Sequence, residues 1–96
     1  MSTPEGKVKK LIKKILDDRN AYYVTPVTGG FGNSGAPDFL VCYRGRFIGI
    51  EAKAGKGKVT ALQQDNINRI NENGGTALVI NESNIDTLVE EFRKYD

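Results

Sequence analysis

The stretch DFLVCYRGRFIGIEAK, residues 38–53, decides the fold and also carries the side chains best suited to chemistry. Two runs rich in β-forming residues, Asp38–Tyr43 and Phe47–Ala52, lie on either side of Arg44-Gly45-Arg46. Apolar runs of this length around a short glycine-containing turn are typical of a β-hairpin. The stretch therefore predicts two neighbouring antiparallel strands.

The register of this hairpin brings two carboxylates together. With Arg44 and Gly45 as a two-residue turn, Asp38 lies opposite Glu51. Directly opposed side chains point to the same face of a sheet, with Cβ atoms roughly 4.5–5.5 Å apart. Lys53 lies two residues beyond Glu51, so strand alternation places its ammonium on the same face. A slip of one residue would send all these side chains to the opposite face.

The residues before the hairpin predict a helix, a strand and a loop. Apolar residues at helical spacing predict a helix over 4–19, started by Thr3-Pro4. Residues 21–27 are rich in β-formers and predict a strand, with Pro26 near its end or on a sheet edge. Residues 29–35 contain four glycines and predict a loop, either a plain connector or one that a ligand approaches closely.

The residues after the hairpin predict a helix, a strand and a last helix. Thr60 starts a helix that stops at Gly74-Gly75, and 76–80 is a short apolar strand. Ser83, with Asp86 three residues later, indicates the N-cap of the last helix. The order helix, three strands, helix, strand, helix predicts an α/β fold, with a central mixed sheet flanked by helices.

The composition excludes several classes of site. The chain is one domain's worth, residues 1–96, with neither a signal-peptide pattern nor the ~20 apolar residues that span a bilayer. A single cysteine, Cys42, excludes an internal disulfide and fits a reducing, cytoplasmic setting. Without histidine, Ser-His-Asp and Cys-His catalysis are excluded, and structural zinc is disfavoured. Any metal should be hard and oxygen-ligated, such as Mg²⁺ or Mn²⁺.

Charge is unevenly distributed along the chain. Residues 1–58 carry eight lysines and three arginines against five acids, whereas 59–96 carry three basic residues against seven acids. A basic first half is compatible with a polyanionic partner, although a solvated helix face of lysines explains part of it equally well. The candidate contacts to the phosphates of such a partner are Lys10, Lys14, Arg44, Arg46, Lys56 and Lys58.

The converging acids and amine suggest phosphodiester hydrolysis. A divalent cation held by two carboxylates can polarise a phosphodiester and lower the pKa of a bound water. A nearby lysine can stabilise the negative charge that develops on the phosphate. Asp38 alone is an ordinary strand-start aspartate, and Glu51-Ala52-Lys53 alone is an ordinary exposed strand end. Their combination in one register favours a nuclease site.

Gly35-Ala36-Pro37-Asp38, followed after the hairpin by Glu51-Ala52-Lys53, resembles the signature of the PD-(D/E)xK nuclease superfamily. Two further motifs narrow the resemblance to a virus-type replication-repair nuclease (VRR-NUC) domain of the stand-alone viral type. They are the stretch Lys58-Val59-Thr60-Ala61-Leu62-Gln63 and the pair Gly74-Gly75 before an apolar strand. The resemblance covers nearly the whole chain and implies a restriction-endonuclease-like core. It further implies that Asp38, Glu51 and the Ala52 carbonyl ligate Mg²⁺ or Mn²⁺, and that Lys53 serves the nucleophile or the transition state.

Two further residues have a role under the resemblance and an ordinary alternative. Gln63 would lie beside the site as a catalytic residue, but Thr60 and Gln63 also form a capping-box pattern. Glu5 matches the family's acidic residue that approaches the metal, but a glutamate is also favoured near a helix N-terminus by the dipole. Gly6 weakens this helix start and leaves the position of Glu5 open.

The resemblance implies a metal-dependent endonuclease that acts as a homodimer on branched DNA such as a four-way (Holliday) junction, in DNA repair. No membrane or small-molecule cofactor is expected, and a virus-encoded enzyme would work in the host cytoplasm. Flap or plain duplex DNA remains an alternative substrate, and a non-catalytic DNA-binding module is an alternative function. A base-reading restriction enzyme is disfavoured by the short chain. Candidate dimer contacts are Tyr22, Tyr23 and Phe31, although core packing also explains the tyrosines.

Overall fold

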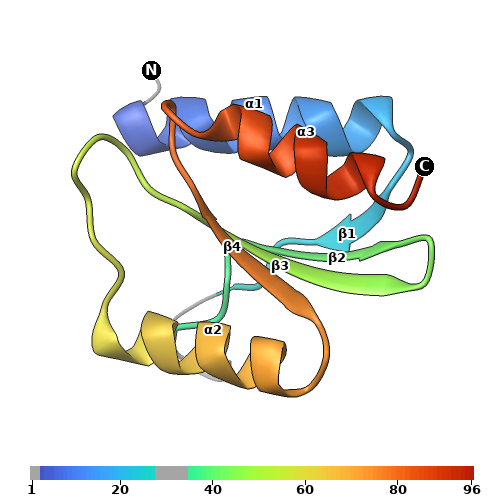
Figure 1. The fold of residues 1–96 in the computed structure, drawn as a ribbon. Helices are drawn as coiled ribbons and strands as arrows, with labels where there is room; N and C mark the ends of the chain where they lie inside the picture. The colour runs from blue at the N-terminus through green and yellow to red at the C-terminus, as the bar shows by residue number, and fades with distance from the viewer. Residues whose placement is uncertain (1–2, 28–34) are drawn as a thin grey trace.

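The computed structural model describes residues 3–27 and 35–96 and has three layers (Figure 1). Helices α1 and α3 lie side by side on one face of a four-stranded sheet, and α2 covers the other face. The predicted order of elements is confirmed. In chain order the elements are α1 (Pro4–Asp18), β1 (Tyr22–Val24), β2 (Phe39–Tyr43), β3 (Arg46–Ala52), α2 (Ala61–Glu72), β4 (Thr76–Ile80) and α3 (Ile85–Arg93).

The sheet is mixed, with strand order β1-β2-β3-β4. Strands β1, β2 and β3 pair antiparallel, whereas β3 and β4 pair parallel through the α2 crossover. The predicted hairpin register is confirmed, because Leu40 lies opposite Gly49 and Tyr43 opposite Arg46. Arg44 and Gly45 have φ angles of 49° and 82°, as a type I′ turn requires at both central positions.

The hydrophobic core lies between the sheet and the α1–α3 layer. Strand β3 contributes Ile48, Ile50 and Ala52, each with 0% exposed surface, which confirms the predicted orientation of its apolar side. Burying large aliphatic side chains contributes roughly 1.5–3 kcal/mol each relative to exposure. This packing holds the opposite side of β3 in a fixed orientation. The fully or nearly fully buried residues around it include Val8, Ile12, Leu16, Val41, Ile80, Leu88 and Phe92.

Helix α2 approaches the hairpin closely at glycine positions. Gly35 has φ +84°, and a Cβ there would lie 2.6 Å from the Leu62 carbonyl carbon. A Cβ at Gly49 would lie 2.8 Å from Ile70 Cδ1 and 3.2 Å from Pro37 Cγ. The missing side chains let the segment before Asp38 and the N-terminal turn of α2 come together.

Several predicted boundaries need correction. The first helix ends at Asp18 rather than 19, with Arg19 as its C-cap. The strand predicted over 21–27 is limited to Tyr22–Val24, because Pro26 has no N–H to continue edge pairing. Most of the predicted 29–35 loop lies outside the described residues.

Ser83 is not the N-cap of the last helix. Asn84 occupies that position, without a side-chain cap. The Asn81 side chain accepts from the N–H groups of Ser83 and Asn84, and Asn84 Oδ1 accepts from the Asn81 N–H. This reciprocal asparagine turn moves the helix start by one residue. In the described part of the chain, no helix has both the length and the apolar character needed to cross a membrane.

We predict that Gly35→Ala destabilises the fold by more than Gly45→Ala. Both glycines have positive φ, which costs an alanine about 1–2 kcal/mol. At Gly35 the new Cβ also clashes with the α2 backbone, whereas nothing lies within 4 Å of a Cβ at Gly45. Chemical denaturation measures both losses, and equal losses would contradict the close approach at Gly35.

Candidate active site

Asp38 lies one residue before β2, at the end of the hairpin away from its turn. Its Oδ2 accepts a hydrogen bond of 2.8 Å from the Ala52 N–H. A side chain thus takes the place of a backbone acceptor where the antiparallel pairing ends. This bond fixes the Asp38 carboxylate next to β3, with 22% of the side chain exposed.

Glu51 is a charged residue on the buried part of β3, with 3% of its surface exposed. Its Oε2 lies 3.6 Å from Lys53 Nζ and accepts a 3.2 Å hydrogen bond from Gln63 Nε2. Burial raises the pKa of Glu51 to about 7, and the neighbouring Asp38 charge adds to the rise against the opposing effect of Lys53. The Asp38 carboxyl therefore lies close enough to Glu51 to disfavour its ionised form.

Gln63 forms the predicted capping box and also contacts Glu51, whereas its catalytic role stays a prediction. Its Oε1 accepts from the Thr60 N–H at 2.9 Å, and Thr60 Oγ1 accepts from the Gln63 N–H at 3.1 Å, which completes a capping box. The amide nitrogen of Gln63 remains available and donates to Glu51. The start of α2 and the orientation of the Glu51 carboxylate are thus fixed by one side chain.

Glu5 reaches the site through Lys9. Its helix start is well formed despite Gly6, whose N–H donates to Thr3 Oγ1 at 3.0 Å. Lys9 Nζ lies 3.6 Å from Glu5 Oε2 and 3.4 Å from Asp38 Oδ1. Lys9 is not among the candidate site residues predicted from the sequence. The signal that could have found it is its i,i+4 spacing from Glu5.

The structure thus brings Lys53 and Gln63 into contact with Glu51, and holds Asp38 next to Glu51 through the Ala52 N–H, with Glu5 at the edge. The donors offered to a metal are carboxylate oxygens, which suit a hard cation. Over residues 3–27 and 35–96, no group of three or more acidic, cysteine or histidine side chains is arranged to hold a metal. A third carboxylate from Glu5 remains a prediction, as do the metal roles of Asp38, Glu51 and the Ala52 carbonyl.

The hairpin-turn arginines lie at the other end of the hairpin from the carboxylates, roughly 15–20 Å away along the strands β2 and β3, which have five and seven residues. Arg46 Nη2 donates to the Gly74 carbonyl at 3.1 Å, and the guanidinium lies 5.5 Å from the Tyr95 ring centroid. Arg46 therefore connects β3 to the α2–β4 turn. Arg44 lies over the Tyr43 ring at 5.6 Å.

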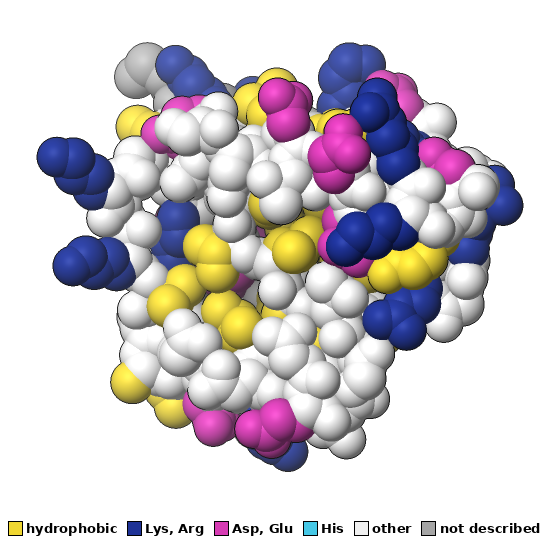
Figure 2. Space-filling view, viewed as in Figure 1, with side chains coloured by type: hydrophobic (Ala, Val, Ile, Leu, Met, Phe, Trp, Pro, Cys, Tyr) yellow, Lys and Arg dark blue, Asp and Glu magenta, His cyan; other side chains and the backbone are white. Residues whose placement is uncertain are grey.

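The candidate lysines lie on two elements. Lys14 pairs with Asp18 on α1 at 3.2 Å, and Lys10 is on the same helix. Lys56 and Lys58 are exposed on the loop between β3 and α2, close in sequence to Lys53. Figure 2 shows basic side chains that project from the side of the molecule where this loop runs. The loop lysines are thus the basic candidates closest in sequence to the carboxylates.

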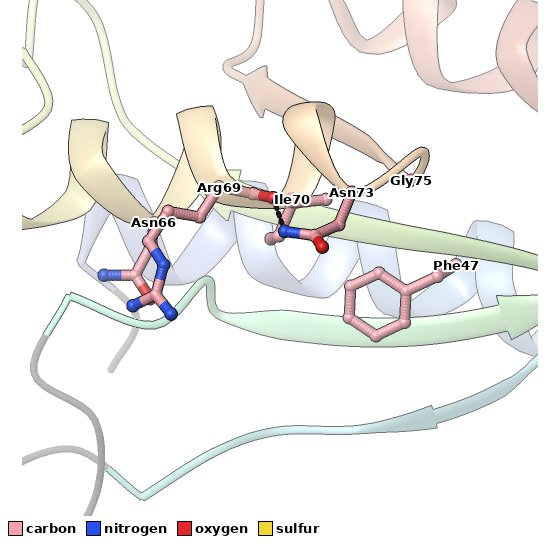
Figure 3. Close-up of a pocket in the computed structure, with 6 residues that line it drawn as sticks. All are labelled: Phe47, Asn66, Arg69, Ile70, Asn73 and Gly75. Atoms are coloured by element: carbon pink, nitrogen blue, oxygen red, sulfur yellow. Dashed lines mark hydrogen bonds between the residues drawn. The ribbon is translucent and has the colours of Figure 1, made fainter.

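A separate pocket lies between α2 and the sheet (Figure 3). It has a volume of about 370 Å³ and a lining of Phe47, Asn66, Arg69, Ile70, Asn73 and Gly75. No carboxylate lines this pocket. Asn73 Nδ2 is bound to the Arg69 carbonyl at 2.7 Å, so its amide completes the helix end. The pocket is therefore distinct from the site of Asp38 and Glu51.

Comparison with known proteins finds a match among solved structures. No family model and no curated protein matches the chain. A solved structure described as a VRR_NUC domain matches with a TM-score of 0.77 and 26% sequence identity, over 95% of this chain and 99% of that chain. The resemblance found in the sequence motifs is therefore confirmed at the level of the fold, including its restriction-endonuclease-like core.

We predict that Glu51→Gln raises the melting temperature of the metal-free protein more at pH 8 than at pH 5. Because the folded-state pKa is raised, the stability that the protonated carboxyl provides is present below about pH 4.5 and is lost as the pH rises through 7. Glutamine keeps an acceptor for Gln63 without gaining charge. Thermal melts at both pH values measure the difference. Glu90→Gln, on an exposed α3 pair, should show no such trend.

A shift for Glu51→Gln that is the same at pH 5 and pH 8 would contradict this account of the Glu51 carboxyl.

Proposed function

We propose that this chain, which has the fold of a VRR-NUC domain, is a divalent-metal-dependent endonuclease that hydrolyses DNA phosphodiester bonds. The observation that carries the proposal is the convergence of two acids and an amine at one end of the hairpin. Asp38 is held by the Ala52 N–H next to Glu51, and the Lys53 ammonium lies 3.6 Å from Glu51. A module that only binds DNA has no use for a buried acid beside a second acid, because both repel phosphate. A cation between them turns that repulsion into coordination.

The residues present fit Mg²⁺ or Mn²⁺. Asp38 and Glu51 would hold the ion, with the Ala52 carbonyl and Glu5 as further oxygen donors. When bound, the ion would polarise the phosphodiester and make a water more acidic. Ionised Glu51 is unfavourable in the metal-free protein, since burial and Asp38 both raise its pKa. Positive charge at this position would offset that cost.

The chain's own side chains prepare the site for hydrolysis. The Ala52 N–H orients Asp38, and Gln63 orients Glu51. Lys53, with 14% of its side chain exposed, is held beside Glu51 and can donate to a phosphate oxygen as negative charge develops there. Hydrolysis joins a water oxygen to phosphorus, while the displaced deoxyribose oxygen leaves and takes a proton. Electrostatic stabilisation by fixed donors is the main contribution that these residues make.

We further propose that the preferred substrate is branched DNA, such as a four-way junction, and that the active form is a homodimer. A two-fold dimer would present two equivalent sites to two strands. The α2-side surface of the sheet supports this proposal, because exposed apolar side chains remain on and beside β1. They are Tyr22, Val24, Val27 and Phe47, with exposures of 71%, 46%, 85% and 45%.

Of the other two dimer candidates, Tyr23 belongs to the fold. Its ring packs edge-on against Phe39 with centroids 5.9 Å apart, and its hydroxyl donates to Asp17. Phe31 lies outside the described residues. Val27 lines a pocket of about 300 Å³ with Pro37, Leu40 and Phe47, which continues the exposed apolar surface.

We predict that the protein cuts labelled four-way junctions in Mg²⁺ or Mn²⁺ and not in chelator, with weaker cutting of flap and plain duplex DNA. Asp38→Asn retains an acceptor for the Ala52 N–H, so it should fold and yet lose activity. Lys53→Met should lower the cleavage rate by about 100-fold or more. Asp65→Asn, an exposed acid on α2, serves as the control with unchanged activity.

Cutting by Asp38→Asn at the wild-type rate would contradict the proposed site. Binding that persists in chelator, with no cutting in either metal, would identify a DNA-binding module.

We predict that Val27→Glu shifts the protein from dimer to monomer in sedimentation velocity. A charge in an apolar contact is costly because it loses water without gaining a partner. Leu11→Gln is the control, since Leu11 is an exposed apolar residue on α1 in the opposite layer and should leave the dimer intact. A wild-type protein that sediments as a monomer at every concentration would overturn the dimer proposal.

A further inference from the structure

Lys9 connects α1 to the carboxylate site. Its Nζ lies 3.4 Å from Asp38 Oδ1 on the hairpin and 3.6 Å from Glu5 Oε2 one helical turn earlier. The ammonium therefore lies between two carboxylates that the proposed function assigns to a metal ion. It holds a position beside Asp38 that a bound cation would also occupy.

The neighbouring lysines of α1 have ordinary surface contacts. Lys13 pairs with Asp17 at 2.8 Å and Lys14 with Asp18 at 3.2 Å, each within the same helix. Lys9 differs because its ion pair with Asp38 crosses from a helix to the sheet. Its side chain is 43% exposed, so the long stem reaches the site without being enclosed by it.

The two oxygens of Asp38 have different partners. Oδ2 accepts from the Ala52 N–H, which leaves Oδ1 as the oxygen facing Lys9. A divalent cation bound to Oδ1 would lie within a few ångströms of the ammonium and repel it. The lysine stem is flexible and partly in solvent, so the ammonium can turn away at modest cost.

We propose that Lys9 is the counter-ion of the metal-free site and that metal binding moves its ammonium from Asp38 to a DNA phosphate. This inference rests on the proposed nuclease function. Without metal, Lys9 and Lys53 offset the negative charge of Glu5, Asp38 and Glu51. A divalent ion adds two positive charges, and the released ammonium then lies at the rim of the site. A DNA phosphate at that rim then replaces Asp38 as the anionic partner of Lys9.

The first test measures Mn²⁺ binding without DNA by calorimetry. Lys9→Met keeps the apolar stem and removes the competing charge, so it should bind Mn²⁺ about two- to fivefold more tightly, the range expected for releasing a partly exposed ion pair. Lys13→Met, on the same helix and paired with Asp17, should bind Mn²⁺ as the wild type does. Equal or weaker binding by Lys9→Met would overturn the proposal.

The second test measures junction binding in Ca²⁺, under conditions shown to give no cutting. Lys9→Met should bind DNA more weakly and with a salt-dependence slope lower by about one, because one phosphate contact is lost. Lys9→Arg should retain wild-type DNA affinity, since it preserves the charge. Unchanged affinity and slope in Lys9→Met would overturn the transfer to phosphate.

The outcomes separate this inference from the function on which it rests. Mn²⁺ binding that is lost in Asp38→Asn but unaffected by Lys9→Met would refute the role of Lys9 and leave the nuclease site standing. Mn²⁺ binding that does not depend on Asp38 would refute both.

Discussion

The register of the β2–β3 hairpin places the carboxyls of Asp38 and Glu51 close together, where they repel each other. The other contacts of the site offset this repulsion. Burial alone raises the pKa of Glu51, and the Asp38 charge raises it further. Hydrogen bonds and positive charge are therefore needed around the pair. The Ala52 N–H donates a hydrogen bond to Asp38, and Gln63 donates one to Glu51. The Lys53 ammonium places positive charge beside Glu51.

The scaffold keeps this unfavourable pair in place. Strand β3 buries its apolar side in the α1–α3 core, so Glu51 on the other side cannot turn away without disrupting that packing. The type I′ turn at Arg44 and Gly45 fixes the register, and Gly35 brings the N-terminal turn of α2 close to the segment before Asp38. Ordinary packing and turn geometry thus hold the two acids close together, as the proposed cation site requires.

Sequence alone predicts the hairpin and its face because both depend on local rules. A two-residue turn and the period-two alternation of strands determine that Asp38 and Glu51 share a side. The motif resemblance likewise gave the fold. The contact between Gln63 and Glu51 is harder to predict, because the capping-box pattern already explains the glutamine. With α2 docked on the sheet, the same side chain makes both contacts.

The features that sequence does not predict depend on tertiary contacts. Lys9 and Lys13 each have an acid four residues away on α1, Glu5 and Asp17, and only the position of α1 over the end of the hairpin gives Lys9 its second partner, Asp38. Arg46 donates to the Gly74 carbonyl in the α2–β4 turn, a contact that its sequence position does not predict, and its contact with phosphate stays a prediction. Ser83 lost its expected role because Asn81 and Asn84 form a stronger local turn. For Lys9 and Arg46, the contact is made with a residue distant in the sequence. For Ser83, the nearby residues Asn81 and Asn84 determine where the helix starts.

The most direct measurement of the central claim is anomalous diffraction from crystals of the protein soaked in Mn²⁺. The account predicts an anomalous peak within bonding distance of carboxylate oxygens from both Asp38 and Glu51. Mn²⁺ bound elsewhere, with no ion between the Asp38 and Glu51 carboxyls, would contradict it.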